Sequence, residues 1–137
     1  MKFGHMVIEK NGIKCKCGNN GCFEAYASMR VLKDKIKSKK KLESITGKEL
    51  YEIIENEEDI RDILDEFVQN LCIGLTNLIR IFEPEAICIG GSFAYFEDLL
   101  LPKVRENVKE NSNKICLSMP EIITAKYEND AGIIGAT

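Results

Sequence analysis

The sequence predicts an α/β protein, and three observations support this class. Long stretches with apolar residues at helical spacing alternate with short apolar runs, such as residues 85–89 and 121–126. Strands that alternate with helices are typical of the α/β class. The chain has 137 residues, about one domain, and its hydrophobic fraction of 45% is sufficient for a globular core.

In the first third, residues 3–8 are short and apolar and predict a strand. Because this strand begins so abruptly, we expect that a preceding segment is missing or is supplied by another chain. Residues 9–21 are rich in glycine and asparagine and predict a loop. A helix is expected over 22–37. It ends in a lysine-rich run, residues 33–41, which is either a solvated helix end that suits the helix dipole or a patch for an anionic ligand.

The middle of the chain predicts two more helices. Thr46 and Glu49 have the spacing of a capping box, so a short helix is expected over 47–55. A long helix is expected over 57–82, with acidic residues in its first turn and Pro84 at its end.

The last third predicts a strand, a turn and a helix, followed by a second strand. A buried strand is expected over 85–89, and it leads into a tight turn at residues 90–92 (Gly-Gly-Ser). A helix is expected over 95–110, in which Pro102 marks a kink or a boundary between two helices. After the strand at 121–126, residues 130–136 resemble the start of another helix.

Charge and hydropathy argue against several partners. Charged residues make up 30% of the chain and the net charge is −3, so nothing global indicates nucleic acid or an anionic membrane, although a local basic patch remains compatible with binding. No apolar run approaches the ~20 residues that cross a bilayer. The first six residues do not resemble a signal peptide. We therefore expect a cytoplasmic protein with no membrane partner.

The six cysteines divide into a cluster and three separate residues. Disulfides are rare in a reducing compartment, where clustered cysteines more often bind metal. Cys15, Cys17 and Cys22 lie within eight residues of one another. The other three lie singly in apolar surroundings, and we expect them to act as small core hydrophobes: Cys72, Cys88 and Cys116.

The cysteine cluster and the single histidine, His5, predict a zinc site. Zn²⁺ takes four nitrogen or sulfur ligands in a tetrahedron, and His5 with Cys15, Cys17 and Cys22 supplies such a set. Because four protein ligands leave no open position, the site would be structural and would not activate water. The spacing alone leaves two alternatives open, namely three free surface thiols and a strand histidine without a ligand role.

Glu24 follows the last of these cysteines by two residues. It is either a first-turn glutamate that stabilises its helix through the dipole, or a carboxylate that accepts hydrogen bonds from a polar ligand such as a sugar hydroxyl.

Three stretches resemble the ROK family, whose name covers repressors, open reading frames and sugar kinases. The first is Gly4-His5 followed by the pattern C-x-C-G-x-x-G-C-x-E-x-x-x-S over 15–28, and it is highly specific. The second is P-E-A-I-C-I-G-G-S over 84–92, and the third is N-D-A-G-I-I-G-A over 129–136. Together they cover nearly the whole chain in the family's order.

The resemblance implies an actin-like ATPase fold (ribonuclease H-like) with two α/β lobes, of which residues 1–137 would be part of the C-terminal lobe. Within it we expect a zinc knuckle at 5–24, a helical insert at about 30–83 and a nucleotide-side strand-turn-helix at 84–137. Members commonly pair through this lobe, so a homodimer is also expected.

The resemblance also implies roles for single residues. His5 and Glu24 match side chains that hold sugar hydroxyls, and Gly90 and Gly91 match glycines that let the backbone approach the adenosine end of the nucleotide. The zinc would be architectural and would support the sugar-binding groups. The matching zinc ligands are His5, Cys15, Cys17 and Cys22.

Parts of the family pattern are missing from this sequence. A ROK kinase is about twice as long and carries a D-x-G-x-T phosphate loop and a catalytic aspartate beside an asparagine in its N-terminal lobe. Asp130-Ala131-Gly132 lacks the threonine and the preceding strand of that loop. Lys2 stands where the family has a sugar-contacting glutamate, so either the chain was cut or restarted here, or the sugar site has lost a carboxylate.

Three functions remain open from the sequence. The chain could be the C-terminal part of a glucokinase-like enzyme that moves a phosphoryl group from Mg-ATP to a hexose or N-acetylhexosamine, inactive alone and with no catalytic residue of its own. It could also be the sugar-sensing part of a ROK repressor, which would bind DNA through a segment elsewhere. A free-standing zinc module that binds nucleic acid or protein is the third, supported only by lysines near the cluster.

Overall fold

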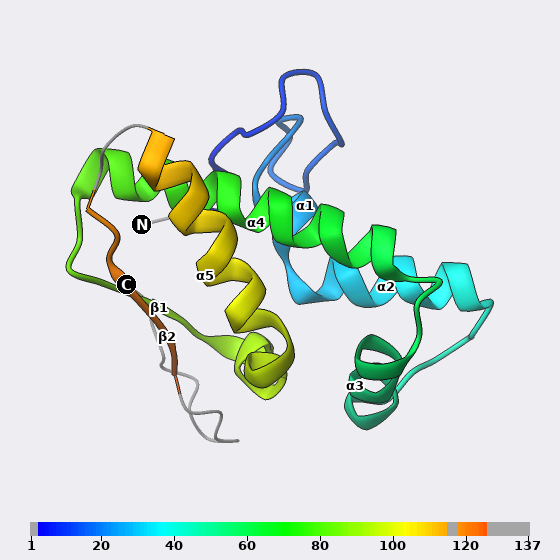
Figure 1. Ribbon diagram of the computed structural model, residues 1–137. Helices are drawn as coiled ribbons and strands as arrows, with labels where there is room; N and C mark the ends of the chain where they lie inside the picture. Colours follow the sequence, from blue (N-terminus) through cyan, green and yellow to red (C-terminus); the bar gives the residue numbers. More distant parts are fainter. Residues whose placement is uncertain (1–2, 115–117, 126–137) are drawn as a thin grey trace. The chain divides into compact units, whose positions relative to one another are not determined.

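The computed structural model describes residues 3–114 and 118–125 (Figure 1). It contains both helices and a parallel pair of strands, which confirms the α/β class. The chain forms two compact units, Met1–Gly74 and Leu75–Thr137, and the boundary falls within the long helix α4 (Arg61–Phe82). None of the helices in the described part of the chain is long and apolar enough to span a membrane.

The first unit begins with a short 3-10 turn, η1 (Phe3–His5), so the prediction of a strand over 3–8 is wrong. The N–H of Met6 bonds to the carbonyl of Phe3 at 3.1 Å, which closes the turn. Only Val7 then makes a β-bridge, to Cys22. The apolar residues have strand propensity, but the described partner segment offers them a single bridge.

Two helices replace the single one predicted over 22–37. They are α1 (Glu24–Ala27) and α2 (Met29–Lys40). Ser28 separates them because its backbone is extended (φ −83°, ψ 150°) and its hydroxyl accepts the N–H of Val31, as an N-cap does.

The lysine-rich run forms the end of α2 and the residue after it. Lys41 adopts a left-handed conformation (φ 57°) and ends the helix. Lys40 Nζ bonds to the carboxylate of Asp59 at 2.8 Å and also to Glu57. These carboxylates raise the pKa of Lys40, and Lys40 lowers the pKa of Asp59. Lys40 is therefore neutralised by two carboxylates and is not offered to an anionic ligand.

The capping box at Thr46 is confirmed. The Thr46 hydroxyl accepts the N–H of Glu49 at 3.1 Å, and the Glu49 carboxylate accepts the N–H of Thr46 at 3.3 Å. The helix α3 (Gly47–Asn56) follows. The next helix, α4, begins at Arg61 and not at 57, because Glu57 is extended and ends α3.

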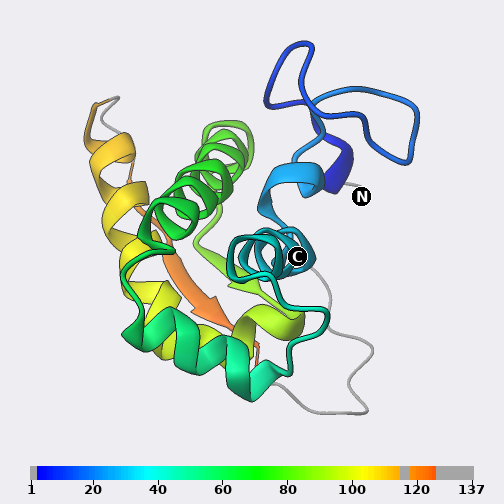
Figure 2. The same ribbon diagram turned by 90° about the vertical axis from the view of Figure 1, so that its right-hand side faces the viewer.

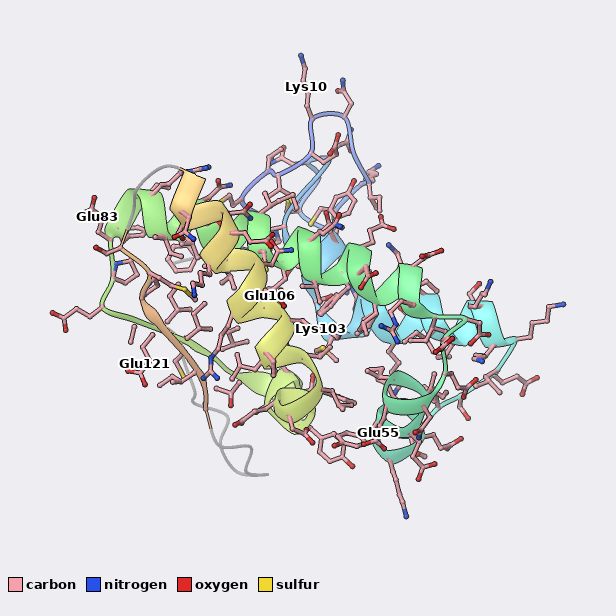
Figure 3. All side chains as sticks on the ribbon, in the orientation of Figure 1. Lys10, Glu55, Glu83, Lys103, Glu106 and Glu121 are labelled. Carbon is pink, nitrogen blue, oxygen red and sulfur yellow. The ribbon has the colours of Figure 1, made fainter. Side chains whose placement is uncertain are left out.

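The core of the first unit is built from apolar side chains of α2, α3 and α4 and of the segments that join them. Its most deeply buried side chains include Leu32, Ile36, Ile60 and Leu64. Gly74 lies against Phe23, and a Cβ atom built on Gly74 would lie 2.4 Å from the aromatic ring. The ring of Phe23 can therefore pack here only because residue 74 of α4 is a glycine. Charged side chains such as those of Lys10 and Glu55 project outward from the unit (Figure 3).

The second unit contains a two-stranded parallel sheet and a helix. Strand β1 (Ala86–Ile89) pairs with β2 (Glu121–Thr124), with Ile89 opposite Thr124. Helix α5 (Glu97–Lys114) runs beside the strands in both views (Figures 1 and 2). The Arg105 guanidinium fastens it there, because it donates bonds of 3.1 and 2.8 Å to the carbonyl of Ile122.

The turn after β1 is tighter than a simple loop. It forms a 3-10 helix, η2 (Gly91–Phe96), which continues directly into α5. Pro102 lies inside α5 and does not divide it, so a boundary between two helices is not found there. The proline sits in the second turn, where it removes only one backbone hydrogen bond.

The expected core role is confirmed for Cys72, which is fully buried, and only in part for Cys88, which is half-buried. Cys116 and the predicted helix start at 130–136 lie outside the described residues.

Replacing Thr46 by alanine should lower the free energy of unfolding by about 1 kcal/mol, because the first-turn N–H of Glu49 loses its acceptor. Urea denaturation measures the change. Thr46→Ser is the matched control, since it keeps the hydroxyl. Equal losses in both variants would mean that the methyl group, and not the cap, stabilises this helix end.

Candidate metal centre

In the loop that carries the cysteines, the outgoing and returning segments run antiparallel and close together. Isolated bridges join Val7 to Cys22 and Lys14 to Asn20. The N–H of Ile8 bonds to the carbonyl of Gly21 at 2.9 Å, which closes the base of the loop. The chain therefore returns from Asn20 to Cys22 alongside the segment that left His5.

A second, smaller turn sets the first two cysteines. The N–H of Gly18 bonds to the carbonyl of Cys15 at 3.0 Å, and the N–H of Cys15 bonds to the carbonyl of Asn19 at 2.8 Å. Cys15 and Cys17 thus occupy a tight turn, with Cys22 on the returning side.

Two glycines permit this path. Gly18 and Gly21 have φ values of +99° and +83°, a region that L side chains rarely adopt. The two differ in their surroundings. A Cβ atom on Gly21 would lie 1.8 Å from the carbonyl oxygen of Glu9, whereas a Cβ on Gly18 would meet nothing within 4 Å. Only Gly21 is required by close approach as well as by conformation.

Tyr26 on α1 supports the loop from its base. Its hydroxyl oxygen accepts the N–H of Ile13 at 2.8 Å. Tyr26 was not among the residues that the sequence indicated for this site. A tyrosine four residues after Cys22 could have suggested the role, because the hydroxyl of a half-buried tyrosine usually finds a polar partner.

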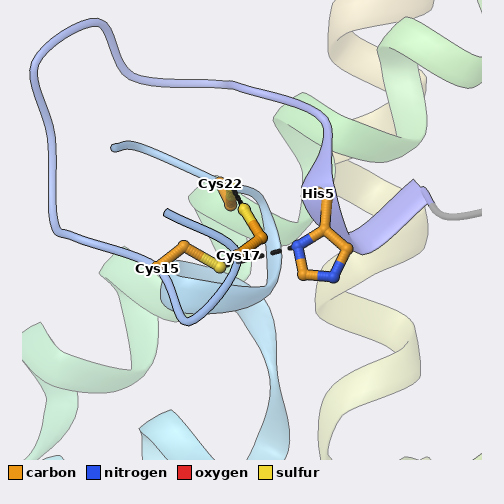
Figure 4. A group of neighbouring side chains, drawn as sticks. All are labelled: His5, Cys15, Cys17 and Cys22. Atoms are coloured by element: carbon orange, nitrogen blue, oxygen red, sulfur yellow. Dashed lines mark hydrogen bonds between the residues drawn. The ribbon is translucent and has the colours of Figure 1, made fainter. Parts of the chain in front are cut away.

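Four potential ligand atoms converge at this loop (Figure 4). The side chains are those of His5, Cys15, Cys17 and Cys22, and their ligand atoms all lie within 4.8 Å of one another. Cys15 Sγ is 3.5 Å from His5 Nδ1, and Cys17 Sγ is 3.5 Å from Cys22 Sγ.

These distances fit the edges of a metal tetrahedron. Bonds of about 2.3 Å from zinc to sulfur place two sulfur ligands about 3.8 Å apart, so only small movements would complete the polyhedron. The group can therefore hold a metal ion. The approach of Nδ1 to Cys15 Sγ indicates that this nitrogen of His5 faces the cluster.

Burial differs among the three thiols. Cys15 and Cys22 are buried and Cys17 is exposed. Burial raises the pKa of Cys22 to about 12, whereas a hydrogen bond from the backbone of Asn19 lowers the pKa of Cys17. A metal ion must displace the proton of Cys22, so metal affinity should increase as the pH rises.

Glu24 lies next to this cluster, as the first residue of α1. Its Oε1 is 3.8 Å from His5 Nε2 and 3.9 Å from Cys15 Sγ. The side chains of His5 and Glu24 are 34% and 45% exposed. One ring nitrogen of His5 thus faces the sulfur atoms, and the other faces a carboxylate that solvent can reach.

The remaining predicted site residues lie elsewhere. Gly90 and Gly91 follow β1 in the second unit, and Gly91 has a φ of +71° with open space where a Cβ would stand. The carboxyl ends of parallel strands are the usual ligand edge of α/β sheets. Lys2 lies outside the described residues.

Comparison with solved structures gives the fold. The chain superposes on a ROK hexokinase from Thermus thermophilus with a TM-score of 0.78 at 21% identity, covering 95% of this chain and 43% of that one. A ROK glucokinase from Streptomyces griseus, solved with glucose and AMPPNP, gives a TM-score of 0.72 at 23% identity and covers 95% and 47%. The fold is that of the C-terminal part of an actin-like ATPase.

Comparison with protein families and curated sequences gives the family. The ROK family profile matches residues 1–137, and the chain belongs to the ROK family. It is 34% identical over 135 residues to the xylose repressor of Bacillus spizizenii, covering 98% of this chain and 35% of the repressor. It is 28% identical over 149 residues to the glucokinase of Thermotoga maritima, covering 98% and 47%. The chain thus spans about a third to a half of the length of these relatives and matches their C-terminal portions.

Alanine substitutions at Gly18 and Gly21 should distinguish two reasons for a glycine, namely the lack of space for a side chain and the positive φ angle. Gly18→Ala should cost about 1–2 kcal/mol in conformational strain and leave metal binding in place. Gly21→Ala should abolish metal binding, because the new methyl group overlaps the Glu9 carbonyl and opens the base of the loop. Zinc titration against a competing chelator measures both. Tight zinc binding by Gly21→Ala would contradict the described path of the loop.

Proposed function

We propose that this chain is the zinc-holding and sugar-binding part of a glucokinase-like ROK kinase. One observation carries the proposal: His5 lies between a cluster of three thiols and the Glu24 carboxylate, with a different ring nitrogen facing each. This arrangement joins a structural metal site directly to a pair of polar groups that solvent can reach.

Zinc at this site would have an architectural role. His5, Cys15, Cys17 and Cys22 are the proposed ligands, and four protein ligands leave no open position. The ion would hold the turn at Cys15 and the returning strand at Cys22 against η1. Its effect on chemistry would be indirect, through the orientation of His5.

That orientation determines the hydrogen bonds His5 can make. A histidine that ligates through Nδ1 must carry its proton on Nε2, because the neutral ring has only one. Nε2–H is then a donor and the Glu24 carboxylate is an acceptor, 3.8 Å apart. A sugar hydroxyl both accepts and donates, so it can satisfy the two groups together. This complementarity supports a hexose or an N-acetylhexosamine as the ligand.

The proposed parent reaction is transfer of the γ-phosphoryl group of Mg-ATP to a sugar hydroxyl. Such reactions rest on positioning, on stabilisation of charge and on a carboxylate base. Gly90 and Gly91 are proposed to lie at the adenosine end of the nucleotide, because they follow a parallel strand and Gly91 leaves open space. The glucose and AMPPNP of the Streptomyces griseus structure support this choice of ligands.

The wider organisation follows the same proposal. Residues 1–137 would form part of the C-terminal lobe, with the zinc knuckle at 5–24, a helical insert at about 30–83 and the nucleotide side at 84–137. We expect the protein to act in the cytoplasm as a homodimer, with no catalytic residue in this part.

A repressor is the second candidate, and a specific observation favours it. The xylose repressors of Bacillus spizizenii and Bacillus subtilis are 34% and 32% identical to the chain, compared with 28% for the Thermotoga maritima glucokinase. The His5 and Glu24 pair would then sense a sugar, and nucleic acid would be bound by another part of the protein. Both candidates share the sugar site.

Glu24→Gln should weaken sugar binding by about tenfold or more, because a charged acceptor becomes a neutral amide. Calorimetric titration with glucose, xylose and N-acetylmannosamine measures the affinity and selects the sugar. Glu55→Gln is the matched control, since Glu55 is exposed and lies on α3. Unchanged affinity in a Glu24→Gln protein that still binds zinc would exclude Glu24 from the sugar site.

The 137-residue chain alone should transfer no phosphoryl group from ATP to glucose. Its sequence contains no D-x-G-x-T phosphate loop, and the chain offers no carboxylate assigned as the base. A coupled ADP-release assay measures turnover, with a complete ROK glucokinase as the positive control. Turnover by the purified chain would mean that a base and a phosphate site are present among these residues.

A further inference from the structure

The sulfur atoms of Cys17 and Cys22 lie side by side in the cluster, as two neighbouring metal ligands would, and they form no disulfide. Their separation is 3.5 Å, and a disulfide bond is about 2.05 Å long. The intervening segment begins with Gly18 and ends with Gly21. The two side chains face each other (Figure 4), and the sulfurs would have to approach by about 1.5 Å to reach bonding distance.

Solvent reaches these thiols unequally. Cys17 is exposed, whereas Cys22 has no exposed surface and Cys15 is only 6% exposed. Cys15 Sγ is also engaged on another side, 3.5 Å from His5 Nδ1 and 3.9 Å from Glu24 Oε1. An oxidant from solvent therefore meets Cys17 first, and Cys22 is the thiol placed to react with the product.

We propose that Cys17 and Cys22 form an oxidative modification site, at which hydrogen peroxide produces a Cys17–Cys22 disulfide and releases the metal. The disulfide itself follows from the positions of the two sulfurs, whereas the release of zinc rests on the function proposed above.

The chemistry balances in two steps. The Cys17 sulfur attacks one peroxide oxygen, the O–O bond breaks, and the products are a sulfenic acid on Cys17 and water. The Cys22 sulfur then attacks the Cys17 sulfur, the S–O bond breaks, and a second water leaves. From the zinc-bound state, two thiolates, one peroxide and two protons from solvent give one disulfide and two waters. Both sulfurs are oxidised, and both peroxide oxygens are reduced.

The modification removes half of the ligand set. Only His5 and Cys15 remain, and two ligands do not hold zinc in a protein site that requires four. Without the ion, Nδ1 of His5 is no longer fixed, so the donor on Nε2 is lost as a defined group. Sugar affinity should fall together with the zinc content, and a dithiol reductant should restore both.

The test treats the zinc-loaded chain with hydrogen peroxide. A chromogenic chelator follows zinc release, and peptide mapping by mass spectrometry locates the disulfide. We expect one zinc released per chain, with Cys17 linked to Cys22. Cys88→Ser is the matched control, because Cys88 is a half-buried thiol outside the cluster. This variant should release zinc and form the disulfide as the original sequence does.

Two further variants make the test independent of metal binding. Cys17→Ser removes the first target and should yield no disulfide within the loop. Cys15→Ser weakens the zinc site and keeps both partners, so the Cys17–Cys22 disulfide should still form.

The outcomes separate the two proposals. A chain that binds no zinc but forms the Cys17–Cys22 disulfide overturns the zinc site and leaves the modification site standing. A chain that holds zinc and gives a disulfide to Cys15, or oxidises Cys17 without forming any disulfide, overturns the modification site.

Discussion

The loop that carries Cys15, Cys17 and Cys22 depends on one close approach, between the backbone of Gly21 and the carbonyl group of Glu9. No side chain fits there, since a Cβ would lie 1.8 Å from the Glu9 oxygen. This contact brings the returning strand against the outgoing one, and the bridge from Val7 to Cys22 follows from it. Without it, the thiol of Cys22 would not face the turn that carries Cys15 and Cys17. The metal, if bound, stabilises a path that the backbone already takes.

The same region is matched by two kinds of relative, repressors and kinases. The xylose repressors and the glucokinase match the chain over nearly its full length, although this region is only a part of each. The sugar binding proposed for His5 and Glu24 would require neither a phosphate loop nor a DNA-binding segment. A binding part that is independent of the response can be joined to either one.

The sequence predicted the cluster well because spacing and composition carry that information directly. One histidine and three cysteines among glycines form a ligand set typical of zinc, and all four side chains converge. The capping box at Thr46 was equally accessible, because both of its hydrogen bonds lie within four residues. For Glu24 the sequence left two roles open, a first-turn glutamate and an acceptor for a polar ligand. Glu24 begins α1 and also lies near His5, so its position is compatible with both roles.

The errors have a common physical cause, which is that local patterns do not report backbone geometry set by distant contacts. Residues 3–8 are apolar enough for a strand, but only Val7 has a bridging partner in the described residues. Ser28 resembled a helix interior until its extended backbone divided α1 from α2. The start of α4 was misplaced because Glu57 and Asp59 extend toward Lys40, on another helix, before the helix begins.

The contact between Phe23 and Gly74 has an evolutionary consequence. Phe23 follows Cys22 directly, and its ring occupies the space that any side chain at position 74 would need. A change at either position alone therefore disturbs the packing of Phe23 on α4, next to the cysteine loop. A smaller residue at 23 would make room for a larger one at 74. Among relatives that keep the three thiols, these two positions should covary.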